Sequence, residues 1–285
     1  MKTQLDIHDF ELFHATVQNM TKVSDSARIT FTPHGFHASV KASVMGKEKV
    51  GRVDIDSTSV SLPDDSDDVT IATKELAVIS QLLGKIVKAH TPKSKKANAA
   101  PPDYSDVVIV LDDMSVNLKS SAFKTKLNLV EPKVVPGIAP FDHRLTKIAD
   151  VNVNVDDVNE ILSSKFIFKS PDGLSVEIAH QDDMLKNFAY AILSDPTDPH
   201  SNSVVSKLGN IMSGDLTRQI FLDMSRLQLL ATFQVESLKL EFNNEPCAVT
   251  EFTDNGSGNG FRTNYKVIFK YLAAPMVDAR AGQLV

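Results

Sequence analysis

The 285-residue chain lacks several features that define whole classes of protein. Its single cysteine, Cys247, excludes a disulfide framework and a cysteine-based zinc site. Tryptophan is absent and only 4 residues are tyrosine, so we expect an aliphatic, phenylalanine-based core. No stretch approaches the ~20 apolar residues of a membrane-spanning helix, and the acids Asp6, Asp9 and Glu11 stand where a signal peptide would be apolar. We therefore expect no membrane partner and an intracellular location: the cytoplasm of a bacterial or infected host cell, or a nucleus.

Basic charge is also in deficit. The chain has 30 Lys and Arg residues against 36 Asp and Glu residues, which gives a net charge of -6. This excludes a wholly basic nucleic-acid coat, although a local basic patch remains possible within an acidic protein. The apolar share of 42% is ordinary for a globular chain, and the length fits one large or two medium domains.

Short runs rich in β-branched residues dominate the chain and predict strands, and two helical patterns interrupt them in each half. Both halves therefore read as helix, strands, helix, strands. The predicted helices are 9–21, 74–89, 156–163 and 224–233. The predicted strands are 28–32, 36–40, 50–55, 58–62, 69–72, 107–111, 115–119, 124–130, 165–169, 174–179, 188–193, 218–222, 238–242, 247–252 and 265–271.

The two halves also share local sequence. Residues 26–36 match residues 163–174 with one residue of slip, and both read as a strand, a Pro-x-Gly turn and a strand. A repeat near half the chain length predicts an α+β protein made of two tandem copies of one domain, each with two helices packed on antiparallel sheets. Three prolines and a glycine make the join at 130–141 extended. The predicted divisions are domain 1 at 1–130, a linker at 131–145 and domain 2 at 146–285.

The helix at 74–89 combines an apolar stripe with a basic face. Lys74, Gln81, Lys85 and Lys88 lie opposite the stripe, and residues 74–96 hold six lysines and one acid. Such a face suits sequence-independent contact with phosphates, and the lack of aromatics favours duplex over single strands. The alternative is an ordinary solvated face. The loop at 91–102 is either a mobile surface loop or a basic finger that uses its lysines, namely Lys93, Lys95 and Lys96.

The other three helices are less basic. Lys22 lies opposite the apolar stripe of the first helix, and Arg226 lies on the flank of the fourth, whose predicted outward residues include Ser225. The third helix presents Asp156 and Glu160, which would repel phosphate unless they serve the helix N-terminus.

No catalytic constellation can be argued from the sequence. The acidic run at 64–68 lacks the glycine and the terminal glutamate of a calcium loop. The glycine-rich run at 255–260 joins two strands and precedes no helix, so a phosphate cradle is not expected. The 8 histidines are scattered, and no Ser/His/Asp or Cys/His set emerges. We expect a protein that is not an enzyme and needs no cofactor or metal.

The last strand ends in Lys-Tyr-Leu-Ala-Ala-Pro at 270–275, which is similar to the terminal Tyr-Leu-Ala-Pro of the PCNA-type DNA sliding clamps. Together with the repeat and the proline-containing linker, it makes nearly the whole chain resemble that family. Departures are the insertion at 91–102, the loop at 254–260 and a longer C-terminal tail. They indicate a divergent member, of the kind found in viruses and phages.

The resemblance implies a DNA-replication accessory protein. Three chains would join head to tail in a ring of six domains, which encircles duplex DNA and tethers a polymerase for processivity. An ATP-driven clamp loader would open the ring. Edge strands at 124–130 and 188–193 would form the subunit interface. The residues expected there are Lys124, Leu127, Leu129, Phe188, Tyr190 and Ile192.

The resemblance also implies a pocket for short peptides of polymerases and repair factors, between the linker and the C-terminal segment. Apolar residues in a proline-rich linker support it, because exposed apolar groups mark binding grooves. The alternative is that these residues pack onto their own sheets. The expected pocket residues are Val40, Val135, Pro136, Gly137, Ile138, Pro246, Tyr271, Leu272, Ala273, Ala274, Pro275 and Met276.

Two other functions stay open. A monomeric or dimeric factor of the same fold would hold DNA by charge and would be strongly salt-sensitive. A metal-dependent DNA enzyme that uses the Asp-rich turns is the third hypothesis.

Overall fold

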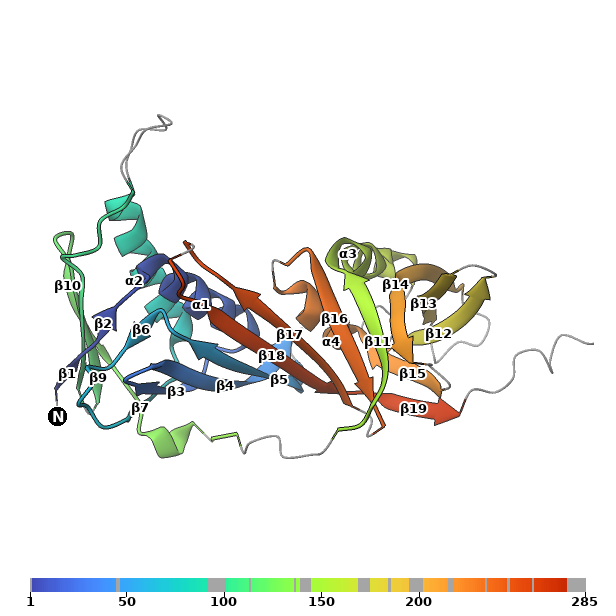
Figure 1. The fold of residues 1–285 in the computed structure, drawn as a ribbon, viewed down its shortest axis with the longest axis horizontal. Coiled ribbons are helices and arrows are strands. Elements are labelled where there is room, and N and C mark those ends of the chain that lie inside the picture. The colour runs from blue at the N-terminus through green and yellow to red at the C-terminus, as the bar shows by residue number, and fades with distance from the viewer. Residues whose placement is uncertain are drawn as a thin grey trace, which may run out of the picture. The chain divides into compact units, whose positions relative to one another are not determined.

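The structure is a computed structural model. It describes residues 2–44, 47–91, 101–112, 114–135, 137–138, 145–168, 175–183, 186–194, 202–214, 218–233, 235–244, 247–257 and 259–275. In these residues the chain is α+β, with antiparallel strands and helices that include α1 (Phe10–Val23), α2 (Leu76–His90), α3 (Val155–Ser163) and α4 (Met224–Ala231) (Figure 1).

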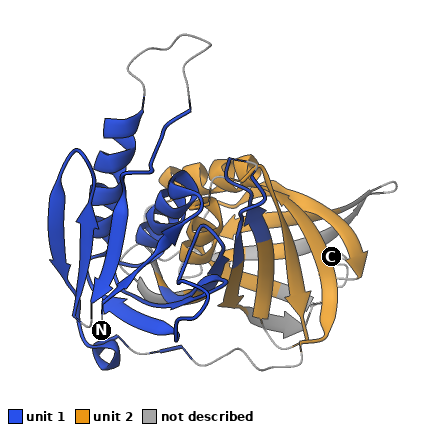
Figure 2. Ribbon diagram, turned by 60° about the vertical axis from the view of Figure 1, so that its left-hand side comes forward, with its two compact units in different colours: residues 1–41, 53–140, 252–265 blue, residues 42–52, 141–251, 266–285 orange. Residues whose placement is uncertain are grey.

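The chain divides into two compact units of three segments each (Figure 2). Unit 1 comprises Met1–Lys41, Val53–Pro140 and Phe252–Tyr265. Unit 2 comprises Ala42–Arg52, Phe141–Glu251 and Lys266–Val285. The sequence predicts a simpler division that cuts the chain only at the linker, into 1–130, 131–145 and 146–285. This division stays a prediction.

Unit 1 contains α1, α2 and three groups of paired strands. Its four-stranded sheet has the order β1-β8-β9-β10, a second group has the order β4-β3-β7, and β2 pairs with β6. The strands are β1 (Thr3–Gln4), β2 (Asp6–Ile7), β3 (Ala27–Thr32), β4 (Gly35–Val44), β6 (Val60–Ser61), β7 (Val69–Thr73), β8 (Val108–Asp112), β9 (Ser115–Lys119) and β10 (Lys124–Asn128).

Unit 2 contains α3, α4 and strands in the order β19-β15-β12-β13-β14-β11-β16-β17. The strands are β11 (Lys147–Asn154), β12 (Ser175–Asp183), β13 (Lys186–Ser194), β14 (Val204–Gly214), β15 (Arg218–Asp223), β16 (Ser237–Asn243) and β19 (Leu272–Pro275). Besides β4, whose residues from Ala42 onward belong to unit 2, three strands contribute residues to both units. They are β5 (Lys47–Ser57), β17 (Cys247–Asp254) and β18 (Thr263–Lys270).

The pairing pattern of unit 1 recurs in unit 2. In unit 1, β3 pairs with β4 and β7, and β1 pairs with β8. In unit 2, β12 pairs with β13 and β15, and β11 pairs with β16. Two copies of one α+β unit, as predicted from the sequence, are therefore present, with β4 equivalent to β13 and β5 equivalent to β14.

The repeat aligns differently from the prediction. Residues 165–169 were predicted as the counterpart of β3, but residues Ser164–Ile167 form the 3-10 helix η2, and β12 is the strand with the pairings of β3. The amide of Ser164 donates to the carbonyls of Glu160 and Ile161, so the end of α3 tightens into a further turn instead of breaking into a strand. The shared local sequence was therefore misleading.

In unit 1, α1 begins where the Asp9 side chain accepts the backbone N–H of Leu12, 2.9 Å away. Phe13 and Val17 of α1 then pack with Leu76 and Leu83 of α2 over the β3, β8 and β9 strands. The two helices approach closely at Gly84, where an added Cβ would lie 3.1 Å from Nε2 of His14. Burial lowers the pKa of that His14 side chain.

A chain of buried hydroxyl groups ties the segment Phe252–Tyr265 into unit 1. Thr263 Oγ1 lies 2.8 Å from Thr16 Oγ1 on α1 and 2.8 Å from Ser57 Oγ on β5. All three side chains are buried, and the Thr16 hydroxyl donates to the Leu12 carbonyl. Satisfied buried polar groups of this kind fix a packing arrangement, because an unpaired one would be costly.

Candidate nucleic-acid and partner interfaces

The basic face predicted for the second helix is present on α2. Leu76, Leu83 and Ile86 are buried, whereas Lys85 and Lys88 are exposed. Gln81 is exposed beside them, and α2 itself contains no acidic residue. The helix therefore offers two ammonium groups to an anion with no carboxylate of its own to compete.

Lys74 does not belong to this helical face. The helix begins at Leu76, and Glu75 is its N-cap residue, with an N–H that donates to Thr73 Oγ1. Lys74 precedes the helix and is exposed. Three further lysines predicted to face DNA lie outside the described residues; they are Lys93, Lys95 and Lys96.

The remaining basic residues have contacts within their own unit. Lys22 at the end of α1 is exposed, and its Nζ donates to Asn19 Oδ1 at 3.2 Å. Arg226 on α4 donates from Nε to the Lys270 carbonyl and lies 3.9 Å from the Asp223 carboxylate. Arg226 is thus held by contacts within unit 2, and its guanidinium is less available to an outside anion than the ammonium groups of Lys85 and Lys88.

The helices of unit 2 carry more acid than base. Asp156 and Glu160 of α3 are exposed, as predicted. Asn154, not an acid, caps α3 with its side chain. Ser225, predicted to point outward on α4, is buried, because its hydroxyl donates to Asp223 Oδ1 at 2.7 Å within the N-terminal cap of the helix.

The last turn of α2 is held by a histidine with two acceptors. Nδ1 of His90 lies 2.8 Å from the Ile86 carbonyl, and Nε2 lies 2.7 Å from Asp106 Oδ1. Both ring nitrogens can donate only in the imidazolium form. The hydrogen bond to the Ile86 carbonyl raises the pKa of His90, and the hydrogen bond to Asp106 raises it further. Hydrogen bonds from Ser121 hold the pKa of Asp106 at about 2.

The predicted peptide-pocket residues occupy different environments. In the linker, Val135 is buried after the short 3-10 helix η1 (Pro132–Val134), whereas Gly137 is exposed and Ile138 is partly exposed. Val135 therefore packs against its own unit, which the sequence left as an alternative. Val40 is buried in β4.

At the other end of the chain, Tyr271 is buried in unit 2, and its hydroxyl donates to the Asn243 carbonyl at 2.7 Å. The backbone of residues 272–275 forms β19, which pairs with β15. The predicted pocket residues Pro136, Pro246 and Met276 lie outside the described residues.

The two predicted edge strands differ. Among the described strands, β10 pairs with β9 alone and is an edge, as predicted. Its Lys124 is exposed and its Leu127 is partly exposed, and Leu129, just after the strand, is buried. The prediction of an edge at 188–193 is wrong, because β13 pairs with β12 on one side and β14 on the other. The sequence patterns did not predict β11 or β14. These two strands pair with each other, and the pairing starts with Val153 opposite Gly209. The preceding residues of β14, 204–208, have β13 on one side and no described strand on the other.

A serine, a histidine and an aspartate that the sequence did not connect come together on β4 and β5. His37 Nδ1 lies 2.7 Å from Asp56 Oδ1, and its Nε2 lies 3.4 Å from Ser39 Oγ. The order matches a hydrolytic triad, but the Ser39 hydroxyl donates to Asp54. Because its hydroxyl proton points to Asp54, Ser39 is not activated by His37, and the group is a partly exposed polar network.

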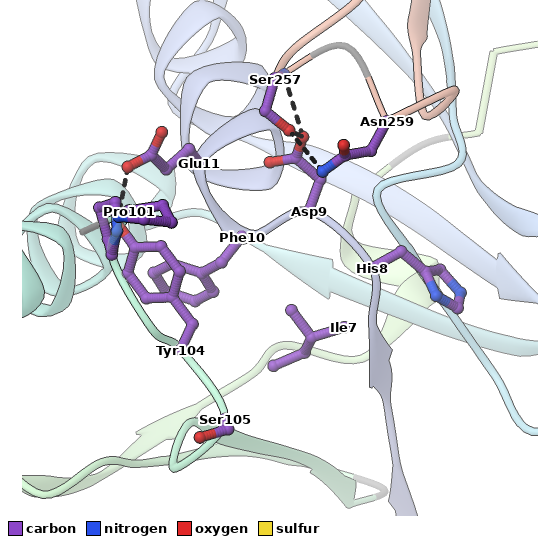
Figure 3. Close-up of a pocket in the computed structure, with 11 residues that line it drawn as sticks. Ile7, His8, Asp9, Phe10, Glu11, Pro101, Tyr104, Ser105, Ser257 and Asn259 are labelled. Atoms are coloured by element: carbon purple, nitrogen blue, oxygen red, sulfur yellow. Dashed lines mark hydrogen bonds between the residues drawn. The ribbon is translucent and has the colours of Figure 1, made fainter. Parts of the chain in front are cut away.

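A cavity of about 350 Å³ lies at the start of α1 (Figure 3). Its acidic groups are engaged: Asp9 Oδ2 accepts the Ser257 hydroxyl at 2.7 Å, and Glu11 accepts the Tyr104 hydroxyl at 2.9 Å. Burial, followed by the bond to Glu11, raises the pKa of Tyr104. These contacts anchor the 101–105 and 254–257 loops to α1.

Within the described residues, there is no group of three or more His, Cys, Asp or Glu side chains that could hold a metal ion. The acidic run at 64–68 forms a turn with four exposed aspartates. A search of the same part of the chain finds no helix with the length and apolar character that crossing a membrane requires.

No protein-family model matches the chain, and no curated protein matches its sequence. Solved structures do match its fold. PCNA from Entamoeba histolytica is 13% identical with a TM-score of 0.59, over 95% of this chain and 98% of that one. A. fulgidus PCNA, solved with the C-terminal region of FEN-1, is 13% identical with a TM-score of 0.56, over 97% and 98%. The C. crescentus beta sliding clamp is 10% identical with a TM-score of 0.62, over 99% of this chain and 68% of that one. The chain therefore has the fold of the PCNA-type sliding clamps.

Proposed function

We propose that the protein is a DNA sliding clamp: a homotrimeric ring that encircles duplex DNA and tethers a polymerase. One observation carries the proposal. Each chain has two copies of the clamp unit, and among the described strands each copy has an edge without a neighbouring strand, at β10 in unit 1 and at residues 204–208 of β14 in unit 2.

Two unlike edges on one chain favour head-to-tail assembly. Pairing β10 of one chain with β14 of the next satisfies backbone groups that would otherwise invite aggregation. Such heterologous contacts produce a closed ring when the rotation between subunits closes, and the fold resemblance supports closure at three chains.

Exposed apolar side chains support assembly at the β14 edge. Val205 on this edge is 57% exposed, and Phe166 and Ile167, which follow α3, are 80% and 44% exposed. The helix α3 packs against β14, and η2, which carries Phe166 and Ile167, packs against α3. Burying them against a second chain would be favourable, at roughly 25 cal/mol per Å² of apolar surface.

The function follows from closure. A closed ring is linked to DNA by topology and needs no contacts with the bases. The lysines of α2 would contact phosphates only weakly, so the ring could slide along the duplex. A tethered polymerase then stays at high local concentration. A loader that opens the ring and partner peptides that bind at the linker belong to this proposal. The A. fulgidus PCNA structure with a FEN-1 segment supports the peptide part.

The assembly can be tested by cross-linking, because the one native cysteine, Cys247, is buried. Lys124→Cys and Val205→Cys place one thiol on each edge. A long, flexible bis-maleimide should convert the double variant into a denaturant-resistant species of three chains, about 94 kDa from 31.2 kDa each. Each single variant should remain one chain, since like edges do not meet in a head-to-tail ring. A double variant that also remains one chain would contradict the ring.

The second candidate is a monomeric or dimeric factor of the same fold that holds DNA by charge. The exposed Lys85 and Lys88 on an acid-free helix favour it. Its binding would fall steeply with salt, whereas a closed ring on circular DNA would not be released.

A further inference from the structure

Unit 2 carries an apolar stripe on one face of its sheet. Along β13, Ala189, Ala191 and Leu193 are fully buried, so the residues between them point to the opposite face. Those residues are partly exposed, and Val205 of the neighbouring β14 strand lies beside them. The apolar stripe consists of Phe188, Tyr190, Ile192 and Val205.

The β13 residues of the stripe lie apart from the strand edge proposed for assembly, whereas Val205 lies on that edge and borders both surfaces. Since β13 is paired along both sides, its backbone has no open edge at these residues. Their side chains stand out from the sheet surface and are partly exposed. Phe188 and Tyr190 contact each other edge to face, with ring centroids 6.2 Å apart.

Unit 1 provides an internal comparison for this face. The equivalent strands β4 and β5 present His37, Ser39, Asp54 and Asp56, which form a polar network. The same fold therefore tolerates a fully polar surface at this place. The apolar stripe is a property of the unit 2 side chains and not a requirement of the architecture, which is typical of a binding surface.

Within β13 and β14, one charged side chain borders the stripe. Among residues 188–194 and 204–214, which are described, Lys207 is the one charged residue. It is exposed, and its Nζ lies 4.3 Å from the centre of the Phe188 ring. A partner carboxylate placed over this ammonium would be attracted to it. On the other flank of the stripe, Glu177 of β12 is the register partner of Ile192, so the partner carboxylate is expected at the Lys207 end.

The size of the stripe selects the kind of partner. Stable protein dimers bury about 800 Å² on each side. A fully buried aromatic side chain contributes about 150–250 Å², and the stripe residues are already partly covered, so together they offer a few hundred Å² at most. That area matches a short peptide segment and is too small for a second globular chain.

We propose that the apolar stripe and Lys207 dock a short segment of a partner protein, one with apolar side chains and at least one carboxylate. The proposal does not depend on ring closure or on the linker pocket.

The test uses the full chain and a random peptide library displayed on phage. Selected peptides are synthesised with a fluorophore, and their affinity is measured by fluorescence polarisation. Expected peptides combine apolar and acidic residues and lose at least tenfold in affinity for the Tyr190→Thr/Ile192→Thr variant. The matched unit 1 variant, His37→Thr/Ser39→Thr, should bind them unchanged.

Charge reversal provides a second reading that does not disturb packing, because Lys207 is exposed. Selection against Lys207→Glu should enrich basic instead of acidic peptides. The proposal is wrong if selected peptides bind the stripe variant as tightly as the original chain, or if Lys207→Glu leaves the charge preference unchanged. A fall in assembly mass caused by the stripe variant would assign the surface to a second copy. Loss of binding to phosphatidylcholine vesicles would assign it to a membrane, and either result would overturn the proposal.

Discussion

The two units share one pattern of strand pairing and differ in the chemistry of both their faces. The helices α1 and α2 of unit 1 contain three lysines and one glutamate, whereas α3 and α4 of unit 2 contain one arginine and three acids. On the sheet surface, unit 1 presents the His37 network and unit 2 presents the apolar stripe. Under the proposed function, unit 1 would therefore contact DNA and unit 2 would contact proteins.

The largest expected effect tests the DNA half of this comparison. Lys85→Glu combined with Lys88→Glu should weaken duplex binding by roughly a hundredfold at about 0.1 M salt and lower the salt slope by about two, one per phosphate contact. Both side chains are exposed, so folding should be unaffected. Fluorescence anisotropy with a labelled duplex measures both quantities.

Two controls accompany this experiment. Lys119→Glu makes the same charge change on a sheet of unit 1, and Lys74→Glu makes it just before the helix. Each should cost far less than the α2 double change. Equal losses from all three would mean that net charge, not the α2 face, governs binding.

The linker gives the next largest effect. Ile138→Glu should reduce binding of a peptide that copies the C-terminal region of a FEN-1 by at least tenfold, because it places a carboxylate in the proposed pocket. The neighbouring Val134→Glu serves as the control, since Val134 is 47% exposed and is not a pocket residue. Calorimetric titration measures both. Unchanged affinity in Ile138→Glu would remove the linker from the partner site.

The acids of unit 2 should give a smaller effect of opposite sign. Asp156→Asn combined with Glu160→Gln should raise duplex affinity about two- to fivefold, because it removes two carboxylates that would repel the phosphates. The effect is small because salt screens the repulsion between exposed charges. Losing Asp156 near the N-terminus of α3 should cost about 0.3–1 kcal/mol of stability. If the duplex affinity does not change, α3 lies away from the DNA and the comparison applies to unit 1 alone.

The smallest effect concerns the anchoring of α2. Since the pKa of His90 is raised in the folded state, its stabilising effect is complete below the ordinary histidine value of about 6.5 and is lost as pH rises through the folded pKa. His90→Gln should therefore lower the melting temperature at pH 6 by about 2 °C and by less at pH 8.5. The exposed His34→Gln is the control. A loss that is the same at both pH values would show that the charge of His90 is irrelevant.

Helical periodicity predicted all four helices, because each buries residues at regular spacing. It placed the start of the second helix two residues early, at Lys74, since exposed positions before the Glu75 cap carry no periodic signal. β14 was missed because Gly209 and a bulge opposite Asp150 break the two-residue alternation. The reverse error occurred at Phe166 and Ile167, whose apolar pattern predicts a strand although they form a 3-10 turn.

Features of the candidate sites that depend on a single helix could be predicted from the sequence. Features that depend on which strands pair with one another were harder to predict. The exposed face of α2 follows from spacing alone. The edge at β13 was wrong, because which strands lie at an edge depends on partners far along the chain. The Ser39–His37–Asp56 contact was missed for the same reason: two strands bring the residues together, and 19 positions separate His37 from Asp56.

The most direct test asks whether the protein holds DNA by topology. The Lys124→Cys/Val205→Cys chain is mixed with nicked circular plasmid, closed by the bis-maleimide and washed at about 1 M salt, where charge contacts are screened within about 3 Å. We expect the cross-linked chains to stay on the circle and to leave when a restriction enzyme linearises it. Release from the intact circle during the salt wash would contradict the ring and favour a factor that holds DNA by charge.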